Sequence, residues 1–168
     1  EESFGFMVGD FVRDKDAVTA SLLICEIAAY QKRINSSVWD YLQNIYNQYG
    51  HHKETLISQI KKGRMGAEEI KIIMSKLRGN PPKMIANSKV IRIEDYQNQT
   101  AIELPSGRKS NLSLPVANVI ILYTENGAKI AARPSGTEPK IKYYISVCGS
   151  SKQMLNPQIK AIKKDLNL

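Results

Sequence analysis

The chain has 168 residues, of which 42% are apolar and 24% charged, so it can bury a core and is too apolar for a disordered tail. Its two cysteines are too few for a disulfide-stapled secreted scaffold or a cysteine zinc site. No apolar run approaches the roughly 20 residues of a transmembrane helix and the acidic start lacks a signal peptide's basic flank, so we expect a soluble, cytoplasmic protein without a membrane partner.

The charge is unevenly distributed. Residues 1–60 hold 5 Lys/Arg and 8 Asp/Glu, whereas residues 61–168 hold 19 and 8. A basic surface attracts polyanions or phosphorylated small molecules, or simply keeps a protein soluble. The sign changes at residues 61–66, which carry two glycines and three cations. We therefore expect a domain boundary there, with one domain over residues 1–60 and a second over residues 61–168.

The first third of the chain has helical patterns. Carboxylates precede an apolar run at residues 17–30, which predicts a largely buried helix. Ser37 and Asp40 have the spacing of a capping box for a second helix that ends at Gly50. His51 and His52 follow that stop, and we expect both in a loop with no metal.

A third helix is predicted at residues 67–78, and beyond it the apolar period changes to that of strands. The predicted strands are residues 90–93, 101–104, 119–123, 129–132 and 141–147. Asn126 and Gly127 favour a type I′ hairpin, which indicates a mainly antiparallel sheet. Asn156 and Pro157 suit the N-cap and first position of a last helix. The predicted fold class is α+β.

One predicted loop, residues 133–139, has a composition suited to an anion. Arg133 offers a planar fork of donors, Ser135 and Thr137 add hydroxyls, and Gly136 lets a backbone N–H approach an oxyanion closely. A proline near each end restricts the loop, so binding orders it at a lower entropic cost. From the residues alone, a phosphate site and a plain strand connection both remain open.

The run R-P-S-G-T-E-P-K at residues 133–140 resembles the phosphate-binding loop in the last domain of the α-D-phosphohexomutases, the phosphoglucomutase and phosphomannomutase superfamily. E-E-S-F-G at residues 1–5, followed by G-D-F-V-R-D-K-D at residues 9–16, resembles the sugar-specificity loop of the third domain and the start of the helix behind it, as in the bacterial phosphoglucomutase branch. The resemblance spans essentially the whole chain. It implies the rear part of an α/β third domain over residues 1–60, then the complete fourth domain, a small antiparallel sheet covered by helices, over residues 61–168.

Two family motifs are missing from the sequence. The loop with the phosphorylated catalytic serine and the Asp-rich magnesium loop belong to the first two family domains, and neither is present here. Asp14 and Asp16 flank Lys15, but they suit a helix N-terminus better than a metal site. We therefore expect a C-terminal fragment that is inactive without the N-terminal mutase domains. Mg²⁺ and glucose 1,6-bisphosphate are implied for the parent enzyme, and no residue of this chain is expected to bind either.

The resemblance implies an enzyme that interconverts hexose 1-phosphate and hexose 6-phosphate through a bisphosphorylated sugar. Arg133, Ser135, Gly136 and Thr137 match the site that holds whichever phosphate is not reacting. Holding that phosphate positions the other end of the sugar for transfer.

The residues that match the sugar site are Glu1 and Ser3, whose side chains suit hydroxyl recognition. Lys15 matches a lysine near the transferring phosphate in some phosphoglucomutases, with a solvated surface lysine as the other interpretation. Phe4 and Gly5 favour glucose phosphate, while mannose and pentose phosphates stay open.

The alternative function is a non-catalytic basic module that binds nucleic acid or acts as a regulatory phosphate-binding domain. Its basis is the positive charge of residues 61–168. Alternation places Tyr143 and Tyr144 on opposite faces of a strand, so the paired exposed aromatics of an RNA-recognition sheet are missing, and we expect no nucleic-acid partner.

Overall fold

The computed structural model describes residues 7–11, 13–61 and 63–168. The chain divides into two compact units, Glu1–Gly50 and His51–Leu168. The composition had placed the boundary between residues 60 and 61. Residues 51–60 instead form a strand of the second unit's sheet, so the division lies at Gly50. The change of charge along the sequence does not reveal this backbone pairing.

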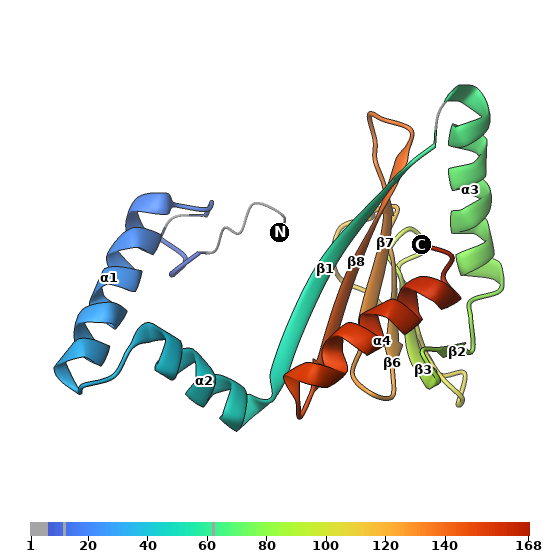
Figure 1. Ribbon diagram of the computed structural model, residues 1–168. Helices are drawn as coiled ribbons and strands as arrows, with labels where there is room; N and C mark the ends of the chain where they lie inside the picture. The colour runs from blue at the N-terminus through green and yellow to red at the C-terminus, as the bar shows by residue number, and fades with distance from the viewer. Residues whose placement is uncertain (1–6, 12, 62) are drawn as a thin grey trace. The chain divides into compact units, whose positions relative to one another are not determined.

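The first unit contains helices α1, Ala17–Arg33, and α2, Val38–Tyr49 (Figure 1). Asp16 caps α1, because its carboxylate accepts from Val18 N at 3.0 Å and Thr19 N at 3.2 Å. The predicted capping box of α2 is confirmed: Asp40 N donates to Ser37 Oγ at 3.1 Å, and Ser37 N donates to the Asp40 carboxylate at 3.0 Å.

The prediction that α1 is largely buried is wrong for the structure described here. Gln31 is its one buried residue, and apolar side chains such as Val18 and Leu22 are exposed. The described part of the first unit contains no strand, so no described sheet of this unit covers the two helices.

The second unit is built on an eight-stranded sheet in which every described pairing is antiparallel. The main path runs β1-β8-β7-β6-β3-β4-β5, and β2 pairs with β3 beside it. The strands are β1 His51–Ile60, β2 Met84–Ile85, β3 Ser88–Asp95, β4 Thr100–Glu103, β5 Lys109–Asn111, β6 Ile120–Thr124, β7 Lys129–Pro134 and β8 Lys140–Gly149. The predicted α+β class with a mainly antiparallel sheet is confirmed.

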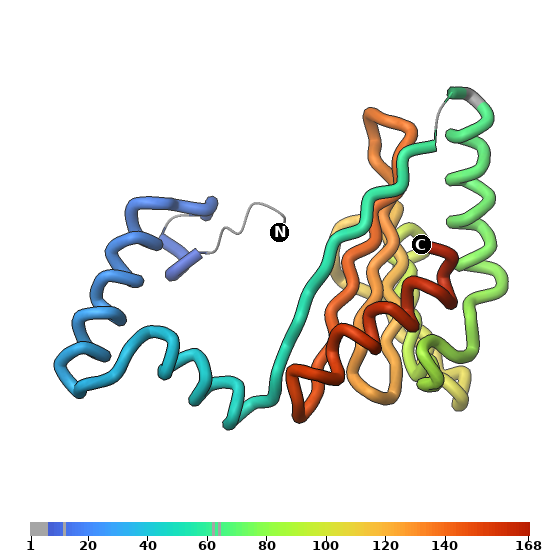
Figure 2. Tube along the Cα trace, in the orientation of Figure 1, coloured from blue at the N-terminus to red at the C-terminus, as the bar shows by residue number. Residues whose placement is uncertain are grey.

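Helices α3, Gly63–Gly79, and α4, Lys152–Asp165, cover one face of this sheet (Figure 2). Met74 of α3 and Ile162 of α4 pack in one core with alternate residues of the strands, for example Ile141 and Ile145 of β8. The opposite face, here called the open face, carries the other residues of each strand, including Arg133 and Lys142. The fold is thus a two-layer sandwich with a helix-covered face and an open face.

The hairpin between β6 and β7 forms where Asn126 and Gly127 predict one, but with a different turn. Gly127 N donates to Thr124 O at 3.0 Å, and of the two predicted turn residues only Gly127 has a positive φ, +81°. A type I′ turn needs a positive φ at both central residues, so this is a type I turn followed by a glycine bulge.

Other boundaries also differ from the predictions. His51 and His52 begin β1 and do not lie in a loop. Helix α4 begins at Lys152, with Ser151 at the N-cap and Pro157 inside it, because the longer helix buries Leu155 against the sheet. No helix in the described part of the chain is long and apolar enough to cross a membrane.

Candidate functional site

The predicted anion loop connects β7 to β8. Arg133 and Pro134 end β7, and Lys140 begins β8. Two backbone bonds shape the loop: Ser135 N donates to Lys140 O at 2.9 Å, and Lys140 N donates to Glu138 O at 2.7 Å. The loop crest is exposed, so its donors can reach a ligand from solvent.

The sheet register adds a second cation to Arg133. Arg133 pairs with Lys142 across β7 and β8, so both side chains project from the open face at the base of the loop. From the sequence, Lys142 could either add positive potential near the phosphate or be a plain surface lysine, and the surface interpretation was slightly favoured, because the pairing partner of a strand residue is not visible in the sequence. Two neighbouring positive charges at the base of an exposed loop favour a phosphate over a neutral ligand.

Glu138 and Lys140 form an ion pair within the loop. The hydrogen bond and the charge of Lys140, together with the charge of Lys142, lower the pKa of the Glu138 carboxyl. Lys140 is therefore compensated within the loop, whereas the Arg133 side chain projects from the open face at the base of the loop.

Gly136 is exposed, and a Cβ built on it would meet no atom within 4 Å. Its φ does not lie in the left-handed region, so the backbone does not itself require a glycine here.

The open face also carries a polar network that sequence reasoning did not predict. Glu94 on β3 is buried, and its carboxylate accepts from Arg92 Nε at 2.9 Å, Tyr96 Oη at 3.0 Å and Tyr123 Oη at 3.1 Å. Burial, with the charge of Glu94 and the hydrogen bond to it, raises the pKa of Tyr123 to about 12. Arg92 and Glu94 are two positions apart on β3, so their side chains lie on the same face of the sheet. These hydrogen bonds link β3 and β6 on the open face.

The sugar-site residues expected from the sequence, Glu1 and Ser3, lie outside the described residues. Lys15 is exposed in the first unit, before α1, whereas Arg133, Ser135, Gly136 and Thr137 share one loop of the second unit. The four predicted phosphate-binding residues thus lie in one loop of the second unit, whereas Lys15 lies in the first unit.

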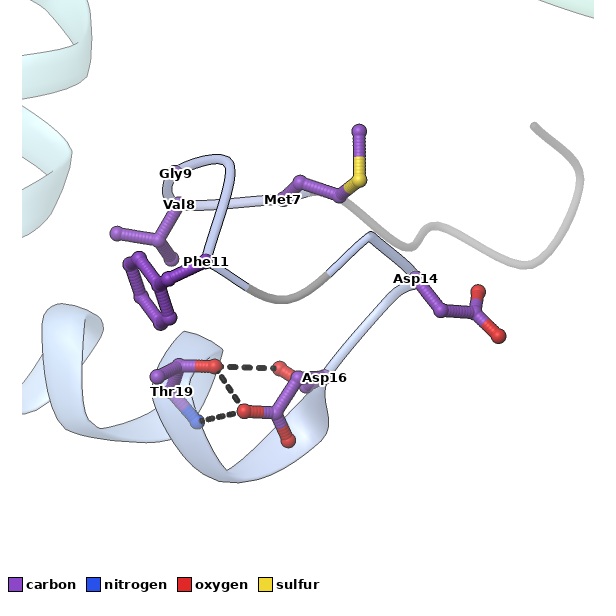
Figure 3. A pocket seen from close by; sticks show the side chains of 7 residues that line it. All are labelled: Met7, Val8, Gly9, Phe11, Asp14, Asp16 and Thr19. Atoms are coloured by element: carbon purple, nitrogen blue, oxygen red, sulfur yellow. Dashed lines mark hydrogen bonds between the residues drawn. The ribbon is translucent and has the colours of Figure 1, made fainter.

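The neighbourhood of Lys15 is shaped by helix capping (Figure 3). Asp16 is turned toward Thr19, and both Thr19 N and Thr19 Oγ1 donate to it. These bonds, the side-chain bond from Thr19 above all, lower the pKa of the Asp16 carboxyl. The hollow beside them measures about 10 Å³, room for about one water and far too little for a hexose.

Magnesium, which the family resemblance implies for the parent enzyme, does not fit the donor sets described here. No group of three or more His, Cys, Asp or Glu side chains that could hold a metal is found among residues 7–11, 13–61 and 63–168. The Asp14 carboxylate points away from Asp16 in Figure 3 and accepts from Lys15 N at 2.7 Å. We therefore assign no step to a metal held by these residues.

The family profile described as "Phosphoglucomutase/phosphomannomutase, alpha/beta/alpha domain III" matches residues 1–49, which is almost the whole first unit. The sequence is 44% identical over 147 residues to a phosphoglucomutase of Staphylococcus aureus (strain bovine RF122 / ET3-1), and 40% identical over 147 residues to one of Staphylococcus haemolyticus (strain JCSC1435).

These matches cover 88% of this chain but only 26% and 27% of the two relatives, so the chain spans about a quarter of their length. The solved structure of the Paramecium phosphoglucomutase pp63/parafusin, in its open form, matches 99% of this chain and 28% of its own, with a TM-score of 0.60. Its sequence identity is 16%, so that likeness bears on the fold alone. Residues 1–49 thus match the third domain of the phosphoglucomutase and phosphomannomutase family, and most of the chain is similar to part of the bacterial phosphoglucomutases.

Proposed function

We propose that this chain is the substrate-binding C-terminal part of a phosphohexomutase that interconverts hexose 1-phosphate and hexose 6-phosphate. The relatives named phosphoglucomutase support the reaction class. The observation that carries the proposal for this chain is the exposed loop after β7, with Arg133 and its cross-strand neighbour Lys142 at its base.

In this proposal the loop holds the phosphate that is not reacting. The Arg133 guanidinium donates to two phosphate oxygens, the Ser135 and Thr137 hydroxyls donate to others, and the Gly136 N–H approaches through its open side. Lys142 adds positive potential without a fixed geometry, because an ammonium group acts as a point charge. Fixing this phosphate leaves the far end of the sugar poised for in-line transfer.

The reaction passes through a bisphosphorylated sugar that must turn over within the site, so the sugar has to bind in two opposite orientations. A single fixed phosphate clamp serves both orientations, because the two ends of the sugar carry the same anionic group. Glu1 and Ser3 would grip hydroxyls that lie similarly in either orientation, and Lys15 would offset charge near the transferring phosphate. We favour glucose phosphate, on the basis of Phe4 and Gly5.

The sequence contains neither the phosphoserine loop nor the Asp-rich metal loop of the family. Mg²⁺ and glucose 1,6-bisphosphate would therefore be bound by the N-terminal domains of the parent enzyme, and we expect no turnover by this chain alone. What the chain retains is recognition of the phosphorylated sugar.

An NMR titration with glucose 1-phosphate, glucose 6-phosphate and inorganic phosphate tests this proposal. We expect all three ligands to shift the amide signals of residues 133–137, and the two sugar phosphates to shift Glu1 and Ser3 as well. Arg133→Ala should abolish the loop shifts, while Arg108→Ala, at an exposed position in another loop, should preserve them. If saturating ligand leaves the loop signals unmoved, or Arg108→Ala reduces them as much as Arg133→Ala, the clamp is not formed.

A further inference from the structure

The second unit contains a cavity of about 540 Å³ that the proposed reaction does not use. Its walls are the end of α3 with the following residues 80–83, and the helix-covered face of β3 and β4. Small-molecule sites fall in the range of roughly 300–1,000 Å³, so this cavity has the size of a ligand site.

The cavity has an apolar floor with a cation at its edge. The register aligns Ile93 with Ile102 across β3 and β4, and Ile102 with Lys109 across β4 and β5. Cross-strand partners project from the same face, so these three side chains form one row along the cavity. Lys83 also lines the cavity, in the segment that follows α3.

The charge of the lining is unbalanced. Asp95, its one carboxylate, accepts from Arg78 Nε at 3.2 Å, Gln97 N at 3.1 Å and Asn98 Nδ2 at 2.5 Å. Arg78 also donates to Asn118 Oδ1 at 2.5 Å, so this rim is fixed.

Lys83 and Lys109 have no carboxylate partner among the described residues. With Arg78 and Asp95 compensating each other, the cavity presents two positive charges.

This cavity is separate from the phosphate loop. Ile120, which lines it, pairs with Ala132 on β7, and Ala132 is buried under the helices. The next residue, Arg133, projects from the open face because strand residues alternate. The two sites thus lie on opposite faces of the sheet, and a ligand in one does not touch the other's cations.

We propose that the cavity binds a small organic phosphomonoester with an apolar body. The dianionic phosphate lies between Lys83 and Lys109, and the apolar body covers Ile93 and Ile102. Inorganic phosphate would leave the apolar floor uncovered, and a neutral apolar molecule would leave the two ammonium groups uncompensated. A ligand with both parts satisfies the whole lining, and the inference does not depend on the proposed mutase reaction.

Phenyl phosphate is a suitable probe, titrated by NMR into the full chain beside equal concentrations of phenol and inorganic phosphate. We expect phenyl phosphate to shift the amide signals of Ile93, Thr100 and Ile102, and the other two compounds to leave them unmoved. Lys83→Gln and Lys109→Gln should each weaken this binding about tenfold, as expected for loss of one charge-assisted contact. Lys160→Gln, on the exposed face of α4, is the matched control and should bind normally.

Three outcomes would overturn the proposal. The first is that the amide signals of the cavity do not shift at about 10 mM phenyl phosphate, a concentration that would fill a site of millimolar affinity. The second is that phenol alone shifts these signals as much as phenyl phosphate does. The third is that both lysine variants bind phenyl phosphate as tightly as the unmodified chain. Arg133→Ala should remove any shifts in the phosphate loop and keep those in the cavity, so failure of one site is distinguishable from failure of the other.

Discussion

Glu94 is a buried carboxylate that keeps its hydrogen-bond partners on the open face of the sheet. Two tyrosine hydroxyls and the Arg92 guanidinium donate to it, and Arg92 also pairs with Glu103 on the next strand. The two carboxylates raise the pKa of Arg92 through their hydrogen bonds. A network of this kind ties β3, β4 and β6 together on the face that no helix covers.

Tyr123→Phe should change how stability depends on alkaline pH. Tyrosine in the unfolded chain ionises near pH 10, whereas in the folded state the pKa of Tyr123 is raised to about 12. The unfolded state therefore loses this proton first, and the free energy of unfolding is steady below about pH 10 and falls between about pH 10 and 12. Urea unfolding across this range should show a shallower fall in Tyr123→Phe.

The same substitution removes one hydrogen bond to Glu94, which should lower stability at neutral pH by about 1 kcal/mol. Tyr49→Phe, at an exposed tyrosine, serves as the control and should leave both quantities unchanged. An alkaline fall as steep in Tyr123→Phe as in the unmodified chain would contradict the role given to Tyr123.

Gly127→Ala should destabilise the second unit. Gly127 has φ +81°, and a Cβ there would lie 2.7 Å from Cys148 Sγ. Left-handed backbone and the close contact together should cost about 1–3 kcal/mol, measured by urea denaturation. Gly136→Ala is the matched control, because it has neither a left-handed φ nor a neighbour within 4 Å, and should change stability by less than about 0.5 kcal/mol. Equal effects at the two glycines would refute the account of the turn.

At the scale of elements, α4 is attached to the sheet by a narrow apolar stripe. Ile162 is fully buried, whereas Met154 in the same helix is 58% exposed. Ile162→Ala should therefore lower the free energy of unfolding by about 2–5 kcal/mol, through lost burial and a residual cavity.

Met154→Ala is the control for Ile162→Ala and should have an effect within about 0.5 kcal/mol. Denaturation in urea measures both variants. Similar losses at the two positions would mean that α4 does not dock through the face that carries Ile162.

The elements that the sequence predicted correctly are those with a strong apolar period. The five predicted strands are all present, and β8 shows the clean alternation expected of it, here of buried and half-buried positions. Strand β1 was missed because it is an edge strand whose residues are all exposed or half-buried, so they do not alternate clearly between apolar and polar. The loop of the candidate site was placed correctly between two strands. The pairing of Lys142 with Arg133 depends on the strand register, which the sequence does not encode locally.

At the scale of the whole chain, the core belongs to the second unit. Every buried apolar side chain among the described residues lies in His51–Leu168, and the domain III family match ends at residue 49, beside the division at Gly50. The change of charge near residue 61 indicated that the chain has two parts but did not give their boundary. Charge reflects the composition of the surface, whereas strand pairing decides which residues belong to the sheet.

A fragment of residues 51–168 should therefore fold by itself. We expect a single cooperative urea transition by circular dichroism, with the same midpoint as the second unit in the full chain. Trp39, the single tryptophan, reports the first unit of the full chain by fluorescence and separates the two transitions. A fragment that fails to fold, or unfolds at a clearly lower midpoint, would show that the second unit depends on residues 1–50.

The central claim is a phosphate clamp built on Arg133. Calorimetry tests it most directly, by measuring the dissociation constant of glucose 1-phosphate for the unmodified chain, Arg133→Ala and Arg133→Lys. Lysine keeps the charge but loses the planar fork of donors, so we predict that both variants bind at least about tenfold more weakly, while Arg108→Lys binds normally. Unchanged affinity in both Arg133 variants would contradict the claim that this loop recognises the phosphate.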